Sequence, residues 1–400
     1  MKNPPRVLIS TIAPVRGGVP AMTGFVAGTL RDKGFEPVLA HYEPYSVSPH
    51  LSVPSFHLLR KRVGTESRRG LGDFETHAIG AWLPELEFTH YLATMHWCRV
   101  MASCAAHVTV AGNTLAAMPY QQTGRPFLAW VATDWQGDRK DRVACFPWSR
   151  KMLDCVVNTP VLRWQERRLL GAGSILALSE YTRRALDGIV GAPVTAGVLP
   201  MPVDADFFAA RPEVMVRGRI GFSGRLDDPR KNLELLLAAL ARVRQEGVEV
   251  TALLIGGMPN DMLRKRIRAL GLEGQIKFRP YLSHPELRDH LQTLDVFALP
   301  SHQEGLCIAA LEAMACGCPV VSTRCGGPEE FVIDGETGFL VDFDSGDMAS
   351  ALARIVVDRR LRAQLATGAR RRVEQQYTRA KAEAVFWNAF SRIFPHLAQG

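Results

Sequence analysis

Two carboxylates interrupt an otherwise apolar stretch in the second half of the chain. The stretch SHQEGLCIAALEAMACGCPVV covers residues 301–321 and contains Glu304 and Glu312, eight residues apart. Its pattern predicts a loop that holds Glu304 after a short strand, followed by a helix over 305–316. Because ligands of open α/β sheets bind outside the carboxyl ends of the strands, both carboxylates are candidates for ligand contacts.

The start of this predicted helix has the features of an anion site. The N–H groups of Gly305, Leu306, Cys307 and Ile308 would point at a ligand together with the positive end of the helix dipole, which suits a phosphate. Glu312 would lie roughly 11 Å further along the helix. Its helical neighbours are apolar on every side, which predicts burial, and a buried carboxylate needs partners. A ribose diol would be one partner, and a hydrogen bond to a neighbouring loop is the alternative.

Two cations stand near the end of another predicted strand. In FSGRLDDPRKNLELLLAAL the strand ends at Gly224, and Arg225 and Lys231 flank the short loop before the next helix. Two cations at the carboxyl end of a strand could neutralise a diphosphate leaving group, whereas ordinary surface charge is the alternative. A further feature is the pair Gly17 and Gly18 after the first strand, which permits close backbone approach or forms a plain strand-to-helix loop.

Elements of α/β type position these residues. Short apolar strands alternate with helical stretches, which predicts doubly wound units, and a length of 400 residues suggests about two domains. A Pro-rich segment at 198–208 is predicted to connect them. The predicted strands lie at 6–11, 37–42, 107–112, 126–133, 175–180, 219–224, 250–257, 275–280, 296–300, 319–323 and 338–342.

Positive charge is concentrated in the first half of the chain. Residues 1–200 contain 22 Lys and Arg against 15 Asp and Glu, which accounts for +7 of the formal net charge of +8. This excess favours a phosphate-bearing substrate or an anionic membrane face, with solvated surface as the alternative. No nucleic-acid-binding signature is present. The eight cysteines form no CxxC pair, which indicates reduced thiols rather than a zinc site.

Taken together, these motifs resemble the retaining nucleotide-sugar glycosyltransferases of the GT-B fold, family four. The resemblance runs through most of the second half and includes its E-x7-E signature. It is carried by Pro300-Ser301-x-x-Glu304-Gly305, Glu312-Ala313-Met314-Ala315-Cys316-Gly317-x-Pro319-Val320-Val321, Gly326-Gly327-Pro328, Gly335-x-x-Gly338-Phe339-Leu340-Val341, Gly224-Arg225-Leu226, Lys231-Asn232 and Pro202-Val203-Asp204.

The resemblance implies a fold and a domain organisation. It implies an α/β chain of the GT-B fold, with two Rossmann-like doubly wound domains facing a central cleft. The expected divisions are an acceptor-side domain over 1–200, a nucleotide-sugar domain over 201–375, and a C-terminal helix over 376–400 that returns to the first domain.

The resemblance also implies roles for the residues singled out above. Arg225, Lys231 and Glu304 are implied to be catalytic, with the two cations on the diphosphate and Glu304 on hydroxyls of the donor sugar. Glu312 is implied to hold the ribose. The amides of the 305–308 segment, with Gly224, Gly17 and Gly18, are implied to line the donor site.

One departure concerns the first domain. Many members of the family place a His-Asp pair after a strand there, whereas Thr133 and Asp134 stand at that place here. Asp134, as a polar contact or a base, and Arg16 are the expected substrate contacts. His96 and His107 are candidates to replace the missing histidine, with structural roles as the alternative.

The expected function is a retaining glycosyltransferase that moves a sugar from UDP or GDP to a glycan, lipid-linked or small-molecule acceptor. No carboxylate stands out as a nucleophile, so front-face attack assisted by the leaving phosphate is expected. No metal or other cofactor is expected, because side chains and the helix end neutralise the diphosphate. A cytoplasmic location with peripheral contact at the inner membrane face is expected. The alternatives are a sugar-nucleotide epimerase of the same architecture and a non-catalytic subunit of a glycan assembly complex.

Overall fold

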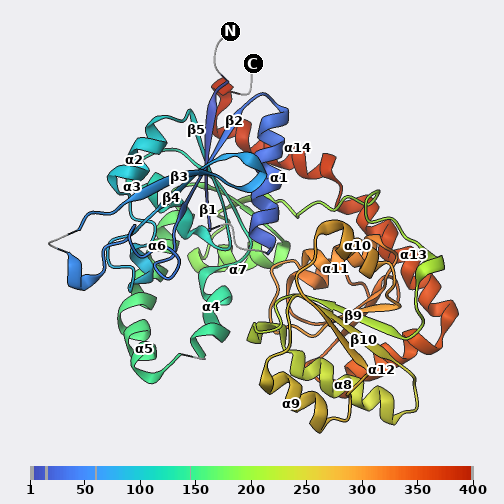
Figure 1. The fold of residues 1–400 in the computed structure, drawn as a ribbon. Coiled ribbons are helices and arrows are strands. Elements are labelled where there is room, and N and C mark those ends of the chain that lie inside the picture. Colours follow the sequence, from blue (N-terminus) through green and yellow to red (C-terminus); the bar gives the residue numbers. More distant parts are fainter. Residues whose placement is uncertain (1–3, 14–16, 59–60, 145, 398–400) are drawn as a thin grey trace. The chain divides into compact units, whose positions relative to one another are not determined.

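The chain divides into two compact units in the computed structural model, which describes residues 4–13, 17–58, 61–144 and 146–397 (Figure 1). Unit 1 comprises Met1–Leu199 together with Glu383–Gly400, and unit 2 comprises Pro200–Ala382. Each unit is an α/β layer structure built on one sheet, and the predicted fold class is confirmed.

Unit 1 contains an eight-stranded sheet in the order β3-β4-β2-β1-β5-β6-β7-β8, in which only the edge strand β3 runs antiparallel to its neighbour. Its inner strands are continuous apolar runs because helices cover both faces of a parallel sheet. The strands are β1 Arg6–Thr11, β2 Glu36–Tyr42, β3 Thr65–Arg69, β4 Glu75–Ile79, β5 Ala106–Ala111, β6 Leu128–Val131, β7 Ser174–Ala177 and β8 Thr195–Val198. The helices are α1 Gly18–Asp32, α2 Met95–Ala102, α3 Met118–Gln122, α4 Trp135–Ala144, α5 Trp148–Leu153, α6 Thr159–Leu170, α7 Glu180–Val190 and α14 Arg379–Ile393.

Three strands of unit 1 were missing from the sequence prediction. They are β3, β4 and β8, and β3 has the sequence TESRR, whose four last residues are all exposed. A polar edge strand has no apolar alternation that a pattern search could detect, and charged side chains on an edge discourage pairing with other chains.

Unit 2 contains a six-stranded parallel sheet in the order β11-β10-β9-β12-β13-β14, and its strands match those predicted. The strands are β9 Arg219–Ser223, β10 Thr251–Ile255, β11 Ile276–Arg279, β12 Val296–Leu299, β13 Val320–Thr323 and β14 Gly338–Val341. The helices are α8 Leu233–Gln245, α9 Asp261–Ala269, α10 His284–Leu291, α11 Ile308–Ala315, α12 Ser345–Val357 and α13 Arg359–Gln376.

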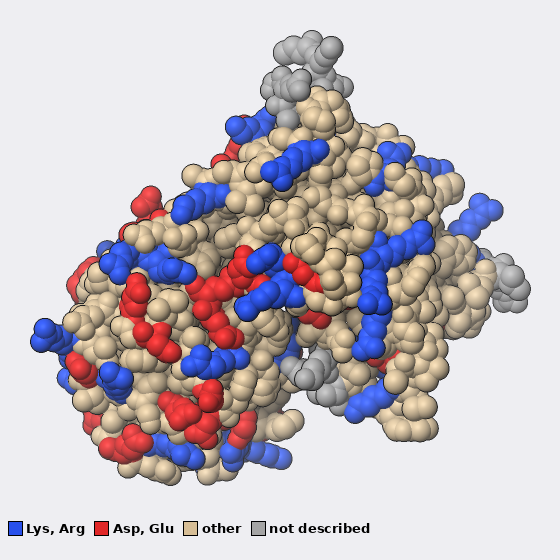
Figure 2. Space-filling model, turned by 180° about the vertical axis from the view of Figure 1, so that it is seen from behind, with Lys and Arg blue, Asp and Glu red and all other residues tan. Residues whose placement is uncertain are grey.

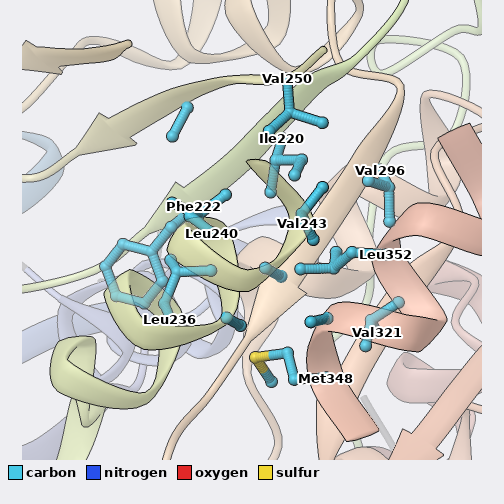
Figure 3. Close-up of a cluster of buried hydrophobic side chains, with 14 of the residues drawn as sticks. Ile220, Phe222, Leu236, Leu240, Val243, Val250, Val296, Val321, Met348 and Leu352 are labelled. Carbon is cyan, nitrogen blue, oxygen red and sulfur yellow. The ribbon is translucent and has the colours of Figure 1, made fainter. Parts of the chain in front are cut away.

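The core of unit 2 holds β9 in a fixed place. Ile220 and Phe222 of β9 pack with Leu236 and Leu240 of α8 and with Leu352 of α12, and all of them are at most 2% exposed (Figure 3). Because alternate residues of a strand point to opposite faces, this packing determines where the end of β9 and the loop after it lie.

The end of the chain belongs to unit 1. The ring of Phe35, just after α1, lies 6.0 Å from the ring of Trp387 and 5.9 Å from that of Phe390, both in α14. Phe386, Phe390 and Phe394 are buried. Unit 1 is therefore built from both ends of the sequence.

The surface charges follow the asymmetry of the sequence. On the face shown in Figure 2, unit 2 carries Lys and Arg side chains (blue) close to Asp and Glu side chains (red). Unit 1 carries Lys and Arg side chains with few Asp and Glu side chains among them. Within the described residues, no helix combines the length and apolar character that crossing a bilayer requires.

Candidate functional site

The loop between β12 and α11 is fastened to the neighbouring strand. The backbone N–H of Glu304 donates to the carbonyl of Cys325 at 2.8 Å, and the N–H of Gly327 donates to the carbonyl of Glu304 at 2.9 Å. A Cβ at Gly327 would lie 2.2 Å from the carbonyl oxygen of Gly305, so only glycine allows this approach. These contacts place Glu304 at the carboxyl end of the sheet.

Helix α11 begins three residues later than predicted. Its first residue is Ile308 instead of residue 305, because Cys307 adopts a left-handed conformation with φ of 70° and the chain turns there. In the described part of the chain, the amides of Gly305, Leu306, Cys307 and Ile308 have no hydrogen-bond acceptor. The helix ends as predicted, with Gly317 left-handed at φ of 73°. Such a row of N–H groups at the positive end of a helix is suited to an anion.

Lys231 and Glu304 form a largely buried ion pair beside this row. The Lys231 Nζ lies 2.6 Å from the Glu304 Oε1, and their side chains are 15% and 11% exposed. The Ser301 hydroxyl donates to the same oxygen at 2.6 Å. Burial lowers the pKa of Lys231, but the charge of Glu304 and the hydrogen bond to Glu304 oppose this effect, and the pKa is raised above its ordinary value. The lysine is therefore a cation at the place predicted for the diphosphate.

Arg225 is the second predicted cation, and Asp228 holds it. The Arg225 Nη2 lies 2.5 Å from the Asp228 Oδ2, and the Arg230 Nη2 lies 3.0 Å from the same atom. Burial would raise the pKa of Asp228, but hydrogen bonds and charge from Arg230, with the charge of Arg225, lower it to about 2. The sequence analysis did not single out Asp228, although its position in the DDPRK stretch between the two predicted cations was a usable signal.

Gly224 and the turn after β10 support these cations. A Cβ at Gly224 would lie 3.2 Å from the Lys231 Cε, and the Gly224 N–H donates to the Ile255 carbonyl at 2.9 Å. Gly256 follows with φ of 125°, and a Cβ there would lie 2.1 Å from the Gly224 carbonyl oxygen. The two glycines therefore let adjacent loops touch through their backbones.

Glu312 lies in the second turn of α11 and is buried. It is 8% exposed, and burial raises the pKa of its carboxyl group to about 8. No hydrogen-bond partner for this carboxyl group is found among the residues that the structure describes. The alternative of a hydrogen bond to a neighbouring loop is thus not what the structure contains, and the carboxyl group remains available to a ligand.

The other predicted site residues belong to unit 1. Gly17 and Gly18 are exposed at the start of α1, where Gly17 has φ of 142°. Arg16 lies outside the described residues. Asp134 precedes α4, and its Oδ2 accepts from the Gly137 N–H at 2.7 Å, which is the contact of a helix cap. Of the predicted residues of unit 2, Lys231 and Glu304 are thus in direct contact, and Asp134 has a structural bond of its own.

The two histidines proposed as substitutes bind main-chain carbonyls. The Nε2 of His96 lies 2.9 Å from the Val63 oxygen, and that of His107 lies 3.3 Å from the Met101 oxygen. Burial lowers the pKa of His107. These contacts are those of structural histidines.

A buried carboxyl group next to Asp134 was not found by sequence reasoning. Glu166 of α6 is 2% exposed, and its Oε1 accepts from the Trp135 N–H at 2.8 Å. Burial raises the pKa of Glu166 to about 7. The hydrogen bond from Trp135 lowers the pKa, and the negative charge of Asp134 raises it further. Within an amphipathic helix its position on the buried face was the only signal.

Comparisons with known proteins identify related sequences. The family model described as glycosyl transferases group 1 matches residues 207–372. A GDP-mannose-dependent alpha-(1-6)-phosphatidylinositol monomannoside mannosyltransferase of Mycolicibacterium smegmatis is 32% identical over 53% of this chain, and the match spans 60% of that protein's length. An MMP alpha-(1->4)-mannosyltransferase of Mycolicibacterium hassiacum is 32% identical over 68% of this chain and 67% of its own.

A solved structure shows the same fold over the whole chain. Sucrose-phosphate synthase from Thermosynechococcus elongatus superposes with a TM-score of 0.77 and covers 98% of this chain and 100% of its own, at 19% identity. At this identity the similarity concerns the fold, which is that of the GT-B glycosyltransferases.

Proposed function

Because the chain belongs to the glycosyltransferases of group 1, we propose that it moves a sugar from a nucleotide-diphosphate sugar to a glycan, lipid-linked or small-molecule acceptor. The observation that carries the proposal is the row of amides at Gly305–Ile308, which have no acceptor among the residues that the structure describes, beside the Lys231–Glu304 pair. A diphosphate would satisfy these donors, and its charge would be stabilised by the positive end of the helix.

The donor side of the proposed reaction follows from the polar groups of unit 2. Lys231 has three N–H donors and gives one to Glu304, which leaves two for phosphate oxygens. Arg225 is half-exposed and adds a second cation. As the bond to the sugar breaks, negative charge grows on the diphosphate, and these fixed cations and amides stabilise it. In this proposal Glu304 binds donor hydroxyls, Glu312 binds the ribose, and no metal ion is needed.

The donor base and the acceptor are proposed from the relatives. The relative from Mycolicibacterium smegmatis is named GDP-mannose-dependent, so GDP-mannose is the first donor to test. Its name includes a phosphatidylinositol monomannoside, which makes an acceptor with a phosphate and a lipid tail the first class to test. Such an acceptor agrees with the positive charge of residues 1–200 and with a peripheral position at a membrane. The retaining course and front-face attack remain part of this proposal.

The test is thermal stabilisation by GDP, UDP and their sugars, measured on the wild type, Glu312→Ala and Lys231→Met. Nucleotide at about 100 times its Kd should stabilise the wild type by about 2.7 kcal/mol. Both variants should lose most of this gain, whereas Glu273→Ala, at an exposed position of unit 2, should keep it. If no nucleotide raises the Tm of the wild type, the donor assignment is wrong.

Turnover separates the proposed transfer from the two alternatives. With GDP-mannose and a phosphatidylinositol mannoside acceptor, a transferase forms a longer glycolipid, and the anomeric configuration of the new bond reports retention. An epimerase would change the sugar nucleotide without any acceptor. Binding of nucleotide sugar without reaction toward a panel of acceptors would favour the non-catalytic subunit.

A further inference from the structure

In the first part of the helical segment over 146–170 of unit 1, up to Asn158, the exposed side chains are largely apolar and the buried ones are polar, whereas α6 buries Leu162, Leu169 and Leu170. The segment contains α5, a π-helical turn at Asp154–Asn158 and α6, which follow one another without a break. Figure 1 shows α4 and α5 at one end of unit 1, projecting away from its strands. A helix at the surface of a soluble domain ordinarily turns its apolar side inward.

The buried side chains of the π-helical turn are polar. Asp154 is 4% exposed, and its Oδ1 lies 2.5 Å from the Nη2 of Arg139, which is itself buried. The same Arg139 atom lies 2.8 Å from the Glu87 Oε2. The Asn158 side chain accepts from the Glu87 N–H at 3.2 Å. These bonds determine which side of the segment faces the protein.

The outer side of the segment is apolar. Trp148, Met152, Cys155 and Val156 follow at intervals of four, seven and eight residues from Trp148, which places them along one stripe of a helix. Trp148 is 77% exposed, Met152 48% and Val156 65%, and Cys155 is also exposed. Trp164, further along in α6, is 57% exposed. A contiguous apolar stripe of this kind on a surface marks a contact with another body.

The charges that accompany this stripe are all positive. The only two carboxylates between residues 146 and 171 are Asp154 and Glu166, and both are buried. The exposed charged residues of the segment are Arg150, Lys151, Arg163, Arg167 and Arg168. The outer side is therefore complementary to an anionic surface.

We propose that this outer side, with Trp148, Met152 and Val156 at its centre, binds the surface of an anionic lipid bilayer. Exposed tryptophan and aliphatic side chains flanked by arginine and lysine are the composition of helices that lie in the membrane interface. A second copy of the chain suits the surface less, because a symmetric contact would place the same cations against one another. The proposal adds a named surface to the membrane contact of the proposed function, and its test uses no sugar transfer.

The test is flotation of the full chain with vesicles of phosphatidylcholine, with and without a phosphatidylglycerol fraction. The wild type should float with the anionic vesicles and remain behind with the neutral ones. The variant Trp148→Ser/Met152→Ser/Val156→Ser should bind at least about tenfold more weakly, and so should Arg150→Glu/Lys151→Glu. The control Phe56→Ser, which removes another exposed apolar side chain of unit 1, should bind as the wild type does.

Two further readouts keep the outcomes distinct. Phosphatidylglycerol with brominated chains should quench the fluorescence of the wild type more than that of Trp148→Phe. GDP stabilisation should be unchanged in the triple variant, so failure of membrane binding and failure of the proposed donor site are separate results. The proposal is wrong if the wild type does not float, if the triple variant floats equally well, or if the stripe is instead covered in a dimer that the triple variant dissociates.

Discussion

At the scale of single residues, Glu312 is the group whose environment says most about a ligand. Its carboxyl group is buried in α11, has a pKa raised to about 8 by burial, and finds no partner in the described part of the chain. A buried carboxyl group without a partner destabilises the fold whenever it is ionised. This unfavourable arrangement is understandable if hydroxyl groups of a nucleotide donate to the carboxylate.

The stability of the protein should therefore depend on pH through Glu312. The folded carboxyl group stays protonated up to about pH 8, whereas the unfolded one ionises near its ordinary value of 4.5. The unfolded chain binds fewer protons between these values, so this group makes stability fall as pH rises. Glu312→Gln should show a growing Tm advantage over the wild type from pH 4.5 to 8, and Glu273→Gln should not.

Nucleotide binding should show the opposite trend at the same residue. Because ribose hydroxyls donate to the ionised form, the affinity of the wild type for the nucleotide should increase as pH approaches 8. The affinity of Glu312→Gln should be lower and flatter with pH. Binding should release the proton of Glu312, and isothermal titration calorimetry in two buffers of different ionisation enthalpy measures this proton release. Equal pH profiles for the two proteins would contradict the assigned role.

At the scale of elements, the site depends on loops that approach through their backbones. Gly256 and Gly257 both donate to the Arg279 carbonyl, at 3.0 and 3.2 Å, and Gly256 lies against the Gly224 carbonyl. The loop that contains Arg225 therefore rests on the turn after β10. A change in that turn would move the cations without touching them.

Gly256→Ala should test this arrangement against Gly247→Ala. Both glycines have positive φ, 125° and 76°, but a Cβ at Gly247 would meet nothing within 4 Å, whereas one at Gly256 would lie 2.1 Å from a carbonyl oxygen. Gly247→Ala should cost about 1 kcal/mol of folding free energy through backbone strain alone. Gly256→Ala should cost more and should also weaken nucleotide binding. If the two variants have equal effects in urea unfolding and in nucleotide titration, the close approach of Gly256 to the Gly224 carbonyl does not matter for stability or binding.

At the scale of the whole molecule, the two ends of the chain complete one unit. Phe390 is fully buried and contacts Phe35, although 355 positions separate them in the sequence. The last part of α14 is thus part of the core of unit 1 and not an appendage.

Phe390→Ala should destabilise unit 1 by about 3–5 kcal/mol, because it removes a buried aromatic ring and leaves a cavity. Asn388→Ala, at an exposed position of the same helix, should change little. Differential scanning calorimetry with and without GDP measures both units, since the nucleotide should still stabilise unit 2 in the Phe390 variant. A wild-type-like scan for Phe390→Ala would show that the helix does not support unit 1.

The sequence by itself determined the fold class and the elements of unit 2, since parallel strands buried on both faces are apolar runs that a pattern reveals. It also placed Glu304, Arg225 and Lys231 in loops that follow strands and Glu312 inside a helix, because spacing along a strand-loop-helix unit is local. The polar edge strand β3 was not predicted, because it becomes a strand through pairing with β4 and has no apolar alternation in its sequence.

Only the tertiary structure decided how these groups are partnered. It paired Lys231 with Glu304 and Asp228 with Arg225 and Arg230, and it begins α11 at Ile308. Among the described residues it gives the Glu312 carboxyl group no hydrogen-bond partner. It also turned the apolar stripe of Trp148 and Val156 outward. The Lys231–Glu304 pair joins residues 73 positions apart, and the free energy of such a contact is not contained in any local pattern.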